Sequence, residues 1–167
     1  MLRARLFYEI FWFYRGKPTR DQYIETMNDF SEFFRFDEHA HFVSFVVYVR
    51  RLFDNDARAI SLLSLAKQSK PNAGVRKLLA EAVPIVKKVR TIRNKAVAHG
   101  DSEMTYNAWI EQADITFNEM RELTEITLKV VNLLSVDNGQ DEVHFAELPA
   151  QDLEDMLKVL SQLPRRR

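Results

Sequence analysis

The sequence predicts an all-α protein, and two observations support this fold class. Only four glycines and five prolines are spread over 167 residues, so the chain contains few residues that break helices. Apolar residues recur three and four positions apart along most of the chain, which is the spacing of one face of an α-helix. The predicted architecture is a four-helix up-and-down bundle core with short accessory helices and an extra C-terminal helix.

The composition indicates one domain without a strong overall charge. Since no repeat, low-complexity tract or linker divides the chain, we expect a single domain over residues 1–164 and a basic tail at 165–167. The 24 basic and 24 acidic residues balance, so any contact with nucleic acid has to be local. The absence of cysteine excludes disulfides and Cys-ligated zinc. No stretch reaches the roughly 18 uninterrupted apolar residues of a membrane span, and we expect a cytoplasmic protein with no membrane partner.

The N-terminal segment is predicted to be an amphipathic helix. Arg3 and Arg5 precede an apolar run, as in a signal peptide, but Glu9 interrupts that run and no small-residue cleavage site follows. Three aromatic residues at helical spacing form the apolar side, namely Phe7, Phe11 and Tyr14.

Two further helices are predicted before residue 54. The first follows residues 16–18, with Thr19 or Asp21 as its cap, and ends near Arg35. Its apolar side consists of Tyr23, Met27, Phe30, Phe33 and Phe34. The second is capped by Asp37. Its core stripe consists of Phe42, Phe45, Val46, Val49, Leu52 and Phe53.

The middle of the chain should contain a connector and a long helix. Residues 54–58 break the preceding helix, 59–68 form a short connecting helix, and 69–72 form a loop. A long helix then runs from about residue 73 toward residue 99, and Pro84 should bend or split it.

The last third should begin with the longest helix, over residues 103–135. A turn at 136–142 and an extended piece at 143–148 follow. A final amphipathic helix is expected over 149–163, because Pro149 suits a first helical turn.

The end of the long helix carries the segment RNKAVAHG, residues 93–100. In a straight helix, residues six apart differ by about 120° around the axis and about 9 Å along it, so Arg93 and His99 are not neighbours on one face. An unwound last turn or a second subunit could bring them together. The structural alternative is a simple helix ending, in which basic residues complement the helix dipole and Gly100 terminates the helix.

This segment resembles the motif of the HEPN superfamily (higher-eukaryote and prokaryote nucleotide-binding). It contains Arg93, the polar Asn94 and His99, with five residues between Arg93 and His99. The stretch HFVSFVVYVRRLFDNDARAISLLSL, residues 41–65, is similar to the abortive-infection AbiU-like branch. The resemblance extends over about residues 7–134, so the C-terminal helix lies outside it. It implies a dimer of helical bundles whose motifs face each other across a cleft, and cleavage of RNA without a metal or other cofactor.

The residue types agree with this chemistry. A histidine that titrates near neutrality can transfer protons, so His99 is the candidate general base or acid. Arg93 offers a fork of donors to a phosphate as charge develops in the transition state, and Asn94 can orient the imidazole or the phosphate. Lys95 and Arg90 are candidate phosphate contacts, and solvated helix-face charges are their alternative interpretation.

Asp101 has two interpretations, an N-cap of the next helix or a carboxylate that orients the catalytic histidine. Some HEPN toxins carry at this position a tyrosine that a partner nucleotidyltransferase modifies, and the present chain departs from that pattern. His39 and His41 are only two positions apart and lack a third ligand nearby in the sequence, so no metal site is predicted.

The sequence therefore suggests an endoribonuclease with a composite site at a homodimer interface, acting in antiphage defence or as the toxin of a toxin–antitoxin pair. RNA is the expected substrate, and a cognate antitoxin or defence-system protein is the expected partner. The alternative is a non-catalytic binding or assembly module for a nucleotide, RNA or a partner protein.

Overall fold

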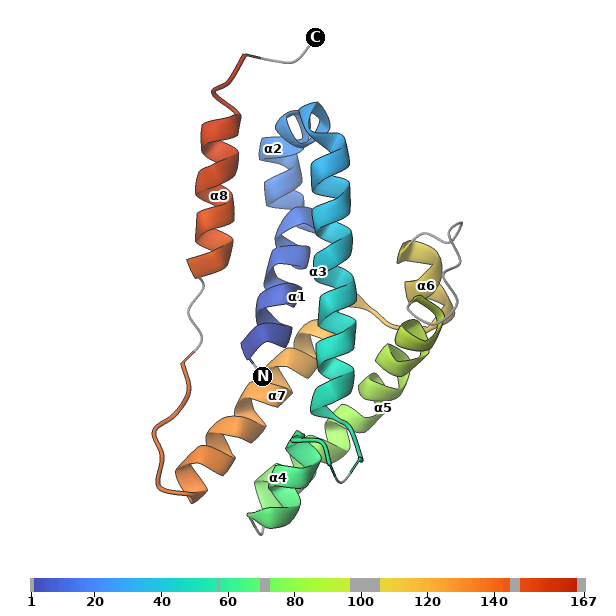
Figure 1. The fold of residues 1–167 in the computed structure, drawn as a ribbon, viewed down its shortest axis with the longest axis vertical. Coiled ribbons are helices and arrows are strands. Elements are labelled where there is room, and N and C mark those ends of the chain that lie inside the picture. The colour runs from blue at the N-terminus through green and yellow to red at the C-terminus, as the bar shows by residue number, and fades with distance from the viewer. Residues whose placement is uncertain (1, 57, 70–72, 97–105, 145–147, 165–167) are drawn as a thin grey trace.

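The computed structural model describes residues 2–56, 58–69, 73–96, 106–144 and 148–164. These residues form helices and no strand, which confirms the predicted all-α class (Figure 1). The helices are α1 (Leu2–Arg15), α2 (Lys17–Asp29), α3 (Ser31–Leu52), α4 (Leu62–Gln68), α5 (Ala73–Ala96), α6 (Tyr106–Gln112), α7 (Phe117–Asp137) and α8 (Leu148–Leu160). None of these described helices is long and apolar enough to cross a membrane.

Four helices form the bundle core, and they pack in a closed order. Helix α1 packs on α3, α3 on α5, α5 on α7, and α7 again on α1. In Figure 1 the α5–α7 pair is inclined to the α1–α3 pair, and the short helices α4 and α6 lie at opposite ends of α5. The four long helices alternate in direction along the chain, as the predicted up-and-down bundle requires.

The main core lies where the four long helices meet. Its fully buried side chains include Phe11, Phe42, Phe45, Val75, Ala82, Met120, Leu123 and Val130. The stripe predicted around residues 42–53 therefore faces the core as expected. Tyr8 connects two helices by a polar contact, because its hydroxyl donates to the carbonyl of Phe117 at 2.9 Å.

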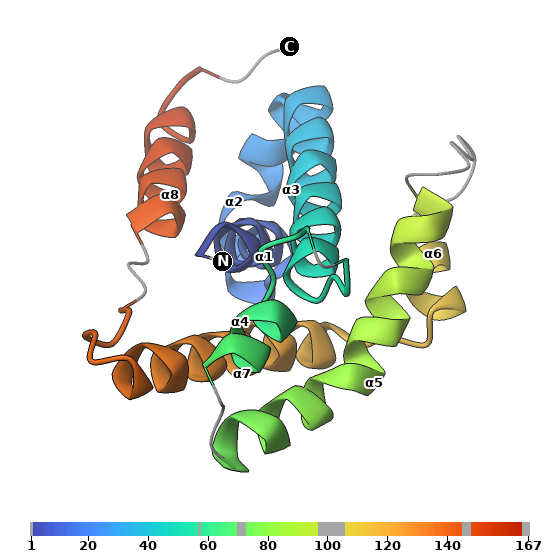
Figure 2. The same cartoon turned by 60° about the horizontal axis from the view of Figure 1, so that its bottom comes forward.

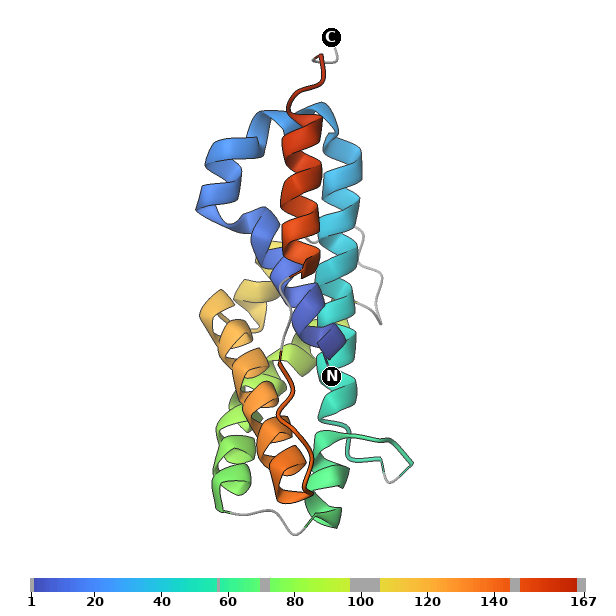
Figure 3. The ribbon, with the colours of Figure 1, turned by 90° about the vertical axis from the view of Figure 1, so that its left-hand side faces the viewer.

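A second, smaller cluster holds α8 against α1 and α2. Its buried members are Tyr14, Tyr23, Met27, Phe34, Leu153 and Leu157. The Tyr14 hydroxyl donates to Asp37 Oδ2 at 2.6 Å, and burial, followed by this hydrogen bond, raises the pKa of Tyr14. Figure 3 looks straight at α8, which lies on the outside of the bundle.

The start of α2 differs from the prediction. Gly16 is the N-cap and makes no side-chain cap bond, whereas Thr19 and Asp21 lie inside the helix. Pro18 occupies the second helical position, where its missing N–H group costs nothing because no partner would exist for it there. The helix therefore begins earlier than the polar residues suggest.

The boundary between α2 and α3 was predicted at the wrong place. Helix α2 ends at Asp29 rather than near Arg35, and α3 begins at Ser31, so Asp37 lies inside α3 instead of capping it. Phe33, expected on the apolar side of the second helix, belongs to α3 and is 55% exposed. The sequence offers no glycine or proline at this boundary, and only the packing of the two helices places it.

The connecting helix and the described part of the long helix agree with the prediction, except that the connecting helix begins at Leu62 instead of residue 59. Residues 70–72 of the predicted loop lie outside the described residues. Helix α4 begins at Leu62, because Ser61 and Ser64 form a reciprocal capping box. Helix α5 contains Pro84 in its interior and is not split there. Figure 2 shows α5 curving along its length, which is the milder of the two predicted effects of Pro84.

The helix predicted over residues 103–135 is interrupted, and residues 103–105 lie outside the described residues. Helix α6 ends at Gln112, and α7 begins after Thr116. Asp114 has a φ of 50°, a left-handed conformation that a helix cannot contain. Thr116 and Glu119 form a capping box that starts α7. As a result α5, with 24 residues, is the longest described helix.

The C-terminal part was predicted approximately. Helix α8 spans Leu148–Leu160 instead of residues 149–163. Residues 145–147, half of the expected extended piece, and the tail at 165–167 lie outside the described residues, and residue 148 belongs to α8. The single-domain boundary at residue 164 stays a prediction.

Packing of α8 can be tested by a truncated side chain. Leu157→Ala should lower the free energy of unfolding by about 2–5 kcal/mol, because Leu157 is fully buried in the second cluster. The measurement is urea unfolding followed by circular dichroism. Val159→Ala is the matched control, since Val159 lies on the same helix and is 62% exposed. Equal effects of the two substitutions would show that α8 does not pack as described.

Candidate functional site

The sequence motif begins on the last described turns of α5. The side chains of Arg93 and Asn94 are both exposed, and Arg93 Nη1 donates to Asn94 Oδ1 at 3.3 Å. The structure thus brings these two predicted site residues together. His99 and Asp101 lie outside the described residues, as does the side chain of Lys95.

The C-terminal part of α5 is a local basic run in a chain of balanced charge. Between residues 87 and 95 it contains no acidic residue. Its basic residues are Lys87, Lys88, Arg90, Arg93 and Lys95. They lie near the end of the helix where the dipole is negative, which favours cations. Because the whole chain has no net charge, a contact with nucleic acid needs a local group of cations, and this run is such a group.

One of these cations anchors α5 to α7. Lys88 Nζ lies 2.7 Å from Glu119 Oε1 and 3.6 Å from Asp114 Oδ2. The hydrogen bond to Glu119 raises the pKa of Lys88, and the same bond, assisted by the hydrogen bonds to Thr116, lowers the pKa of Glu119. Glu119 therefore both caps α7 and fixes the basic end of α5. No sequence signal had indicated the pairing of these two helices.

Helix α6, which follows residues 97–105 in the chain, packs on α5. Trp109 of α6 is buried, and its ring stacks on Phe42 of α3 with 6.5 Å between centroids. His39 lies 6.2 Å from the same indole. The helices on both sides of residues 97–105 are therefore attached to the core of the bundle.

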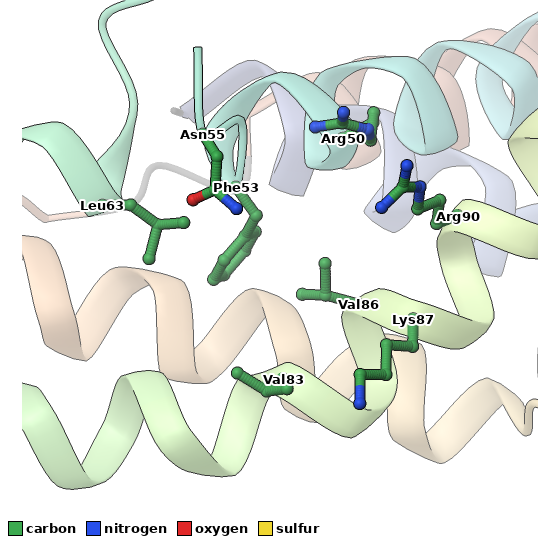
Figure 4. Close-up of a pocket in the computed structure, with 8 residues that line it drawn as sticks. All are labelled: Arg50, Phe53, Asn55, Leu63, Val83, Val86, Lys87 and Arg90. Atoms are coloured by element: carbon green, nitrogen blue, oxygen red, sulfur yellow. The ribbon is translucent and has the colours of Figure 1, made fainter. Parts of the chain in front are cut away.

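A pocket of about 200 Å³ lies beside the basic run (Figure 4). It is lined by Arg50, Phe53, Asn55, Leu63, Val83, Val86, Lys87 and Arg90. Figure 4 shows the guanidinium groups of Arg50 and Arg90 extending from α3 and α5 above the apolar side chains. Arg50 also pairs with Asp54 at 3.4 Å, the helix-end ion pair that the order of residues 50–54 allows. Of the cations that line the pocket, the sequence analysis named Arg90 as a candidate phosphate contact and did not name Lys87.

The remaining histidines lie in other surroundings, with His41 partly buried in the bundle and His144 at the surface. His41 Nδ1 lies 2.8 Å from the Asp37 carbonyl oxygen and 3.3 Å from its carboxylate, both within α3. Its ring lies 5.7 Å from the ring of Phe7 in α1, so this imidazole belongs to the α1–α3 contact. Within the described ranges, no group of three or more histidine, aspartate and glutamate side chains is placed to hold a metal ion. His144 is exposed after the turn that follows α7.

Two features together define a HEPN-type domain. One is the up-and-down helical bundle. The other is an exposed Arg–Asn pair near the end of a long basic helix, with a histidine that is separated from the arginine by five residues. The HEPN AbiU2 family model, described as AbiU2, matches residues 1–159, and the chain therefore belongs to this family. No curated protein and no solved structure matches the chain. The match includes all but the last residue of α8, which the expected resemblance over residues 7–134 left out.

The anchor of α5 predicts a pH dependence of stability. The folded-state pKa of Glu119 is below its ordinary value of 4.5, so this group stabilises the fold above that value and loses its contribution as the pH falls through the folded-state pKa. Glu119→Gln should keep the capping box but remove the charge. It should lower the free energy of unfolding at neutral pH, and its difference from the wild type should shrink below pH 4.5.

The measurement is urea unfolding at pH values above and below 4.5. Glu122→Gln is the control, because it removes the same charge from an exposed position on the same helix. A difference between wild type and Glu119→Gln that stays constant with pH would contradict the role of the charged pair.

Proposed function

We propose that the protein is a metal-independent endoribonuclease whose site is completed across a homodimer interface. It acts in antiphage defence by abortive infection or as the toxin of a toxin–antitoxin pair. The observation that carries the proposal is the exposed Arg93–Asn94 pair on the basic end of α5 in a chain of the HEPN AbiU2 family. RNA is the substrate, and a cognate antitoxin or a defence-system protein restrains the enzyme.

The chemistry needs three contributions. The 2′-hydroxyl loses a proton and its oxygen attacks the adjacent phosphorus, the bond to the 5′-oxygen breaks, and that oxygen gains a proton. The products are a 2′,3′-cyclic phosphate and a 5′-hydroxyl. His99 supplies a proton transfer, because an imidazole exchanges protons near neutral pH. Arg93 stabilises the extra negative charge on the phosphorane.

The side-chain geometry of α5 agrees with these roles. Arg93 uses one nitrogen toward Asn94, and the guanidinium has five N–H donors in all, so most of them can face a phosphate. Asn94, held beside Arg93, orients the phosphate or the imidazole. Arg90 and Lys95 contribute charge along the same helix, and Asp101 orients His99 if it does not cap the next helix.

A dimer accounts for the separation of the two key residues. Arg93 and His99 differ by about 120° and about 9 Å in a straight helix, so one copy of the motif does not form a compact site unless its last turn unwinds. Two copies related by a two-fold axis supply two imidazoles, one for each proton transfer. The dimer is therefore part of the proposal.

The decisive experiment is cleavage of a mixed RNA pool in EDTA. Wild type should cleave, and His99→Ala should lose cleavage by at least about 100-fold, the lower range for general acid–base catalysis. His144→Ala is the matched control and should cleave like the wild type, since His144 is exposed and outside the motif. Light scattering should give twice the mass of one chain for all three proteins.

Other outcomes have defined meanings. Equal cleavage by wild type and His99→Ala would refute a catalytic role of the motif. Binding of RNA without cleavage in any of the proteins would support the non-catalytic binding module instead. A monomer that cleaves at full rate would refute the composite site.

A second substitution tests the arginine separately. Arg93→Lys keeps the positive charge but loses the planar fork of donors, so it should lower kcat/KM for RNA by about 10- to 100-fold. The measurement is single-turnover cleavage of one labelled RNA. Arg121→Lys on α7 is the control, because Arg121 is exposed and pairs only with Glu125 among the described side chains. A loss no larger than that of the control would exclude a bidentate role for Arg93.

A further inference from the structure

We propose that the pocket between α3, α4 and α5 binds a nucleotide of single-stranded RNA beside the cleavage motif, with Arg50, Lys87 and Arg90 holding its phosphate. This inference rests on the proposed function, because it names a second part of the substrate that the same site engages. Nothing in the motif itself requires such a subsite.

The charges of the pocket favour an anion. Arg50 shares its charge with Asp54 at 3.4 Å, whereas neither Lys87 nor Arg90 forms an ion pair with a carboxylate of the described residues. The pocket lining contains no acidic residue. A phosphate would gain charge-assisted hydrogen bonds from two guanidinium groups and an ammonium group.

The floor of the pocket is apolar and suits the uncharged part of a nucleotide. Phe53, Leu63 and Val86 line it, and Val83 lies at its edge with 46% of its surface exposed. Asn55 adds an exposed amide that can hydrogen-bond to a hydroxyl or a base edge. Figure 4 shows the cationic groups on one side and Asn55 and Leu63 on the other.

The volume favours part of a longer strand over a free small molecule. The pocket of about 200 Å³ is smaller than the roughly 300 Å³ at which sites for whole small molecules begin. It therefore has room for a phosphate and its sugar, while the neighbouring nucleotides lie outside. An RNA strand that passes over the pocket meets this condition, and a free nucleotide does not.

The register along α5 connects the pocket to the motif. Lys87 and Asn94 are seven residues apart, so they lie on the same side of the helix and about 10 Å apart along it, with Arg90 between them. This length corresponds to about three stacked nucleotides at about 3.4 Å each. Arg93 itself is three residues beyond Arg90 and is its neighbour on the helix surface. A strand whose cleaved phosphate lies at the Arg93–Asn94 pair thus reaches the pocket two or three nucleotides away.

The test is binding of a labelled single-stranded RNA decamer, followed by fluorescence anisotropy at several salt concentrations. The His99→Ala protein is used so that the RNA stays intact. Adding Lys87→Gln and Arg90→Gln should weaken binding at least about tenfold, because the phosphate loses its charge-assisted hydrogen bonds to both side chains. The salt dependence should also become weaker, because the slope of log K against log salt falls by about 0.7 for each phosphate that the protein no longer neutralises.

The control removes two charges elsewhere. Lys77→Gln and Arg121→Gln change exposed cations on α5 and α7 outside the pocket, and together they should weaken binding less than twofold. Equal weakening by both pairs would overturn the subsite, since it would reduce the effect to overall charge.

A second pair of variants tests the pocket by adding a charge. Val83→Glu places a carboxylate at the edge of the pocket and should weaken RNA binding at least about tenfold. Val136→Glu makes the same exchange at an exposed position on α7 and should leave binding within about twofold of the unsubstituted protein. Unchanged binding by Val83→Glu would overturn the proposal independently of the lysine and arginine variants.

Further measurements distinguish an RNA strand from a free nucleotide as the ligand, and the subsite from the proposed ribonuclease activity. Inorganic phosphate or AMP that displaces the RNA at micromolar concentration would overturn the RNA assignment in favour of a free nucleotide site. If the pocket substitutions change neither RNA binding nor RNA cleavage by the protein that retains His99, the subsite is overturned and the ribonuclease proposal stands. Pocket-dependent binding without cleavage would support the subsite and refute the enzyme. Absence of RNA binding would overturn both.

Discussion

Helix α5 has to bury one side against α3 and α7 while its other side stays in water, and the candidate site depends on how this constraint is met. Val75, Ala82, Ile85, Val89 and Ile92 are buried at intervals of seven, three, four and three residues, and each large apolar side chain contributes about 1.5–3 kcal/mol when fully buried. This burial fixes the rotation of the helix. The cations of the basic run are thereby turned outward, because charged side chains are not buried on the apolar side. Among the described cations of this run, only Lys88 is anchored to α7, through Glu119.

The same constraint explains the pocket beside the motif. Helix α3 ends at Leu52, the chain crosses over to α4, and α4 packs on α7. The side of α5 between these elements remains incompletely covered, so the exposed Val83 and the partly buried Val86 line a hollow at the edge of the main core. The guanidinium groups of Arg50, from the end of α3, and of Arg90, from α5, lie on the same side of this hollow (Figure 4). Charge from two helices that are separate in the sequence is concentrated at one place next to Arg93.

The C-terminal helix belongs to the other end of the molecule. Helix α8 packs on α1 and α2 through its own apolar cluster, and Figures 1 and 2 show it on the opposite side of the α1–α3 pair from α6. It therefore stabilises the first half of the bundle and does not cover the basic end of α5. The family match extends almost to its end, so the family model includes this helix.

The sequence by itself determined the helical class, the core stripe around Phe42 and Val49, and the segment that carries Arg93 and Asn94, because these depend on local spacing and on residue chemistry. It did not reveal the break at Asp114, although Thr116 and Glu119 carried a capping-box pattern that could have indicated it. Only the tertiary structure decided the α2–α3 boundary, the pairing of Lys88 with Glu119 and the meeting of Arg50 with Lys87 and Arg90. These features join residues far apart in the chain, or depend on how two helices pack, and no local pattern encodes such contacts.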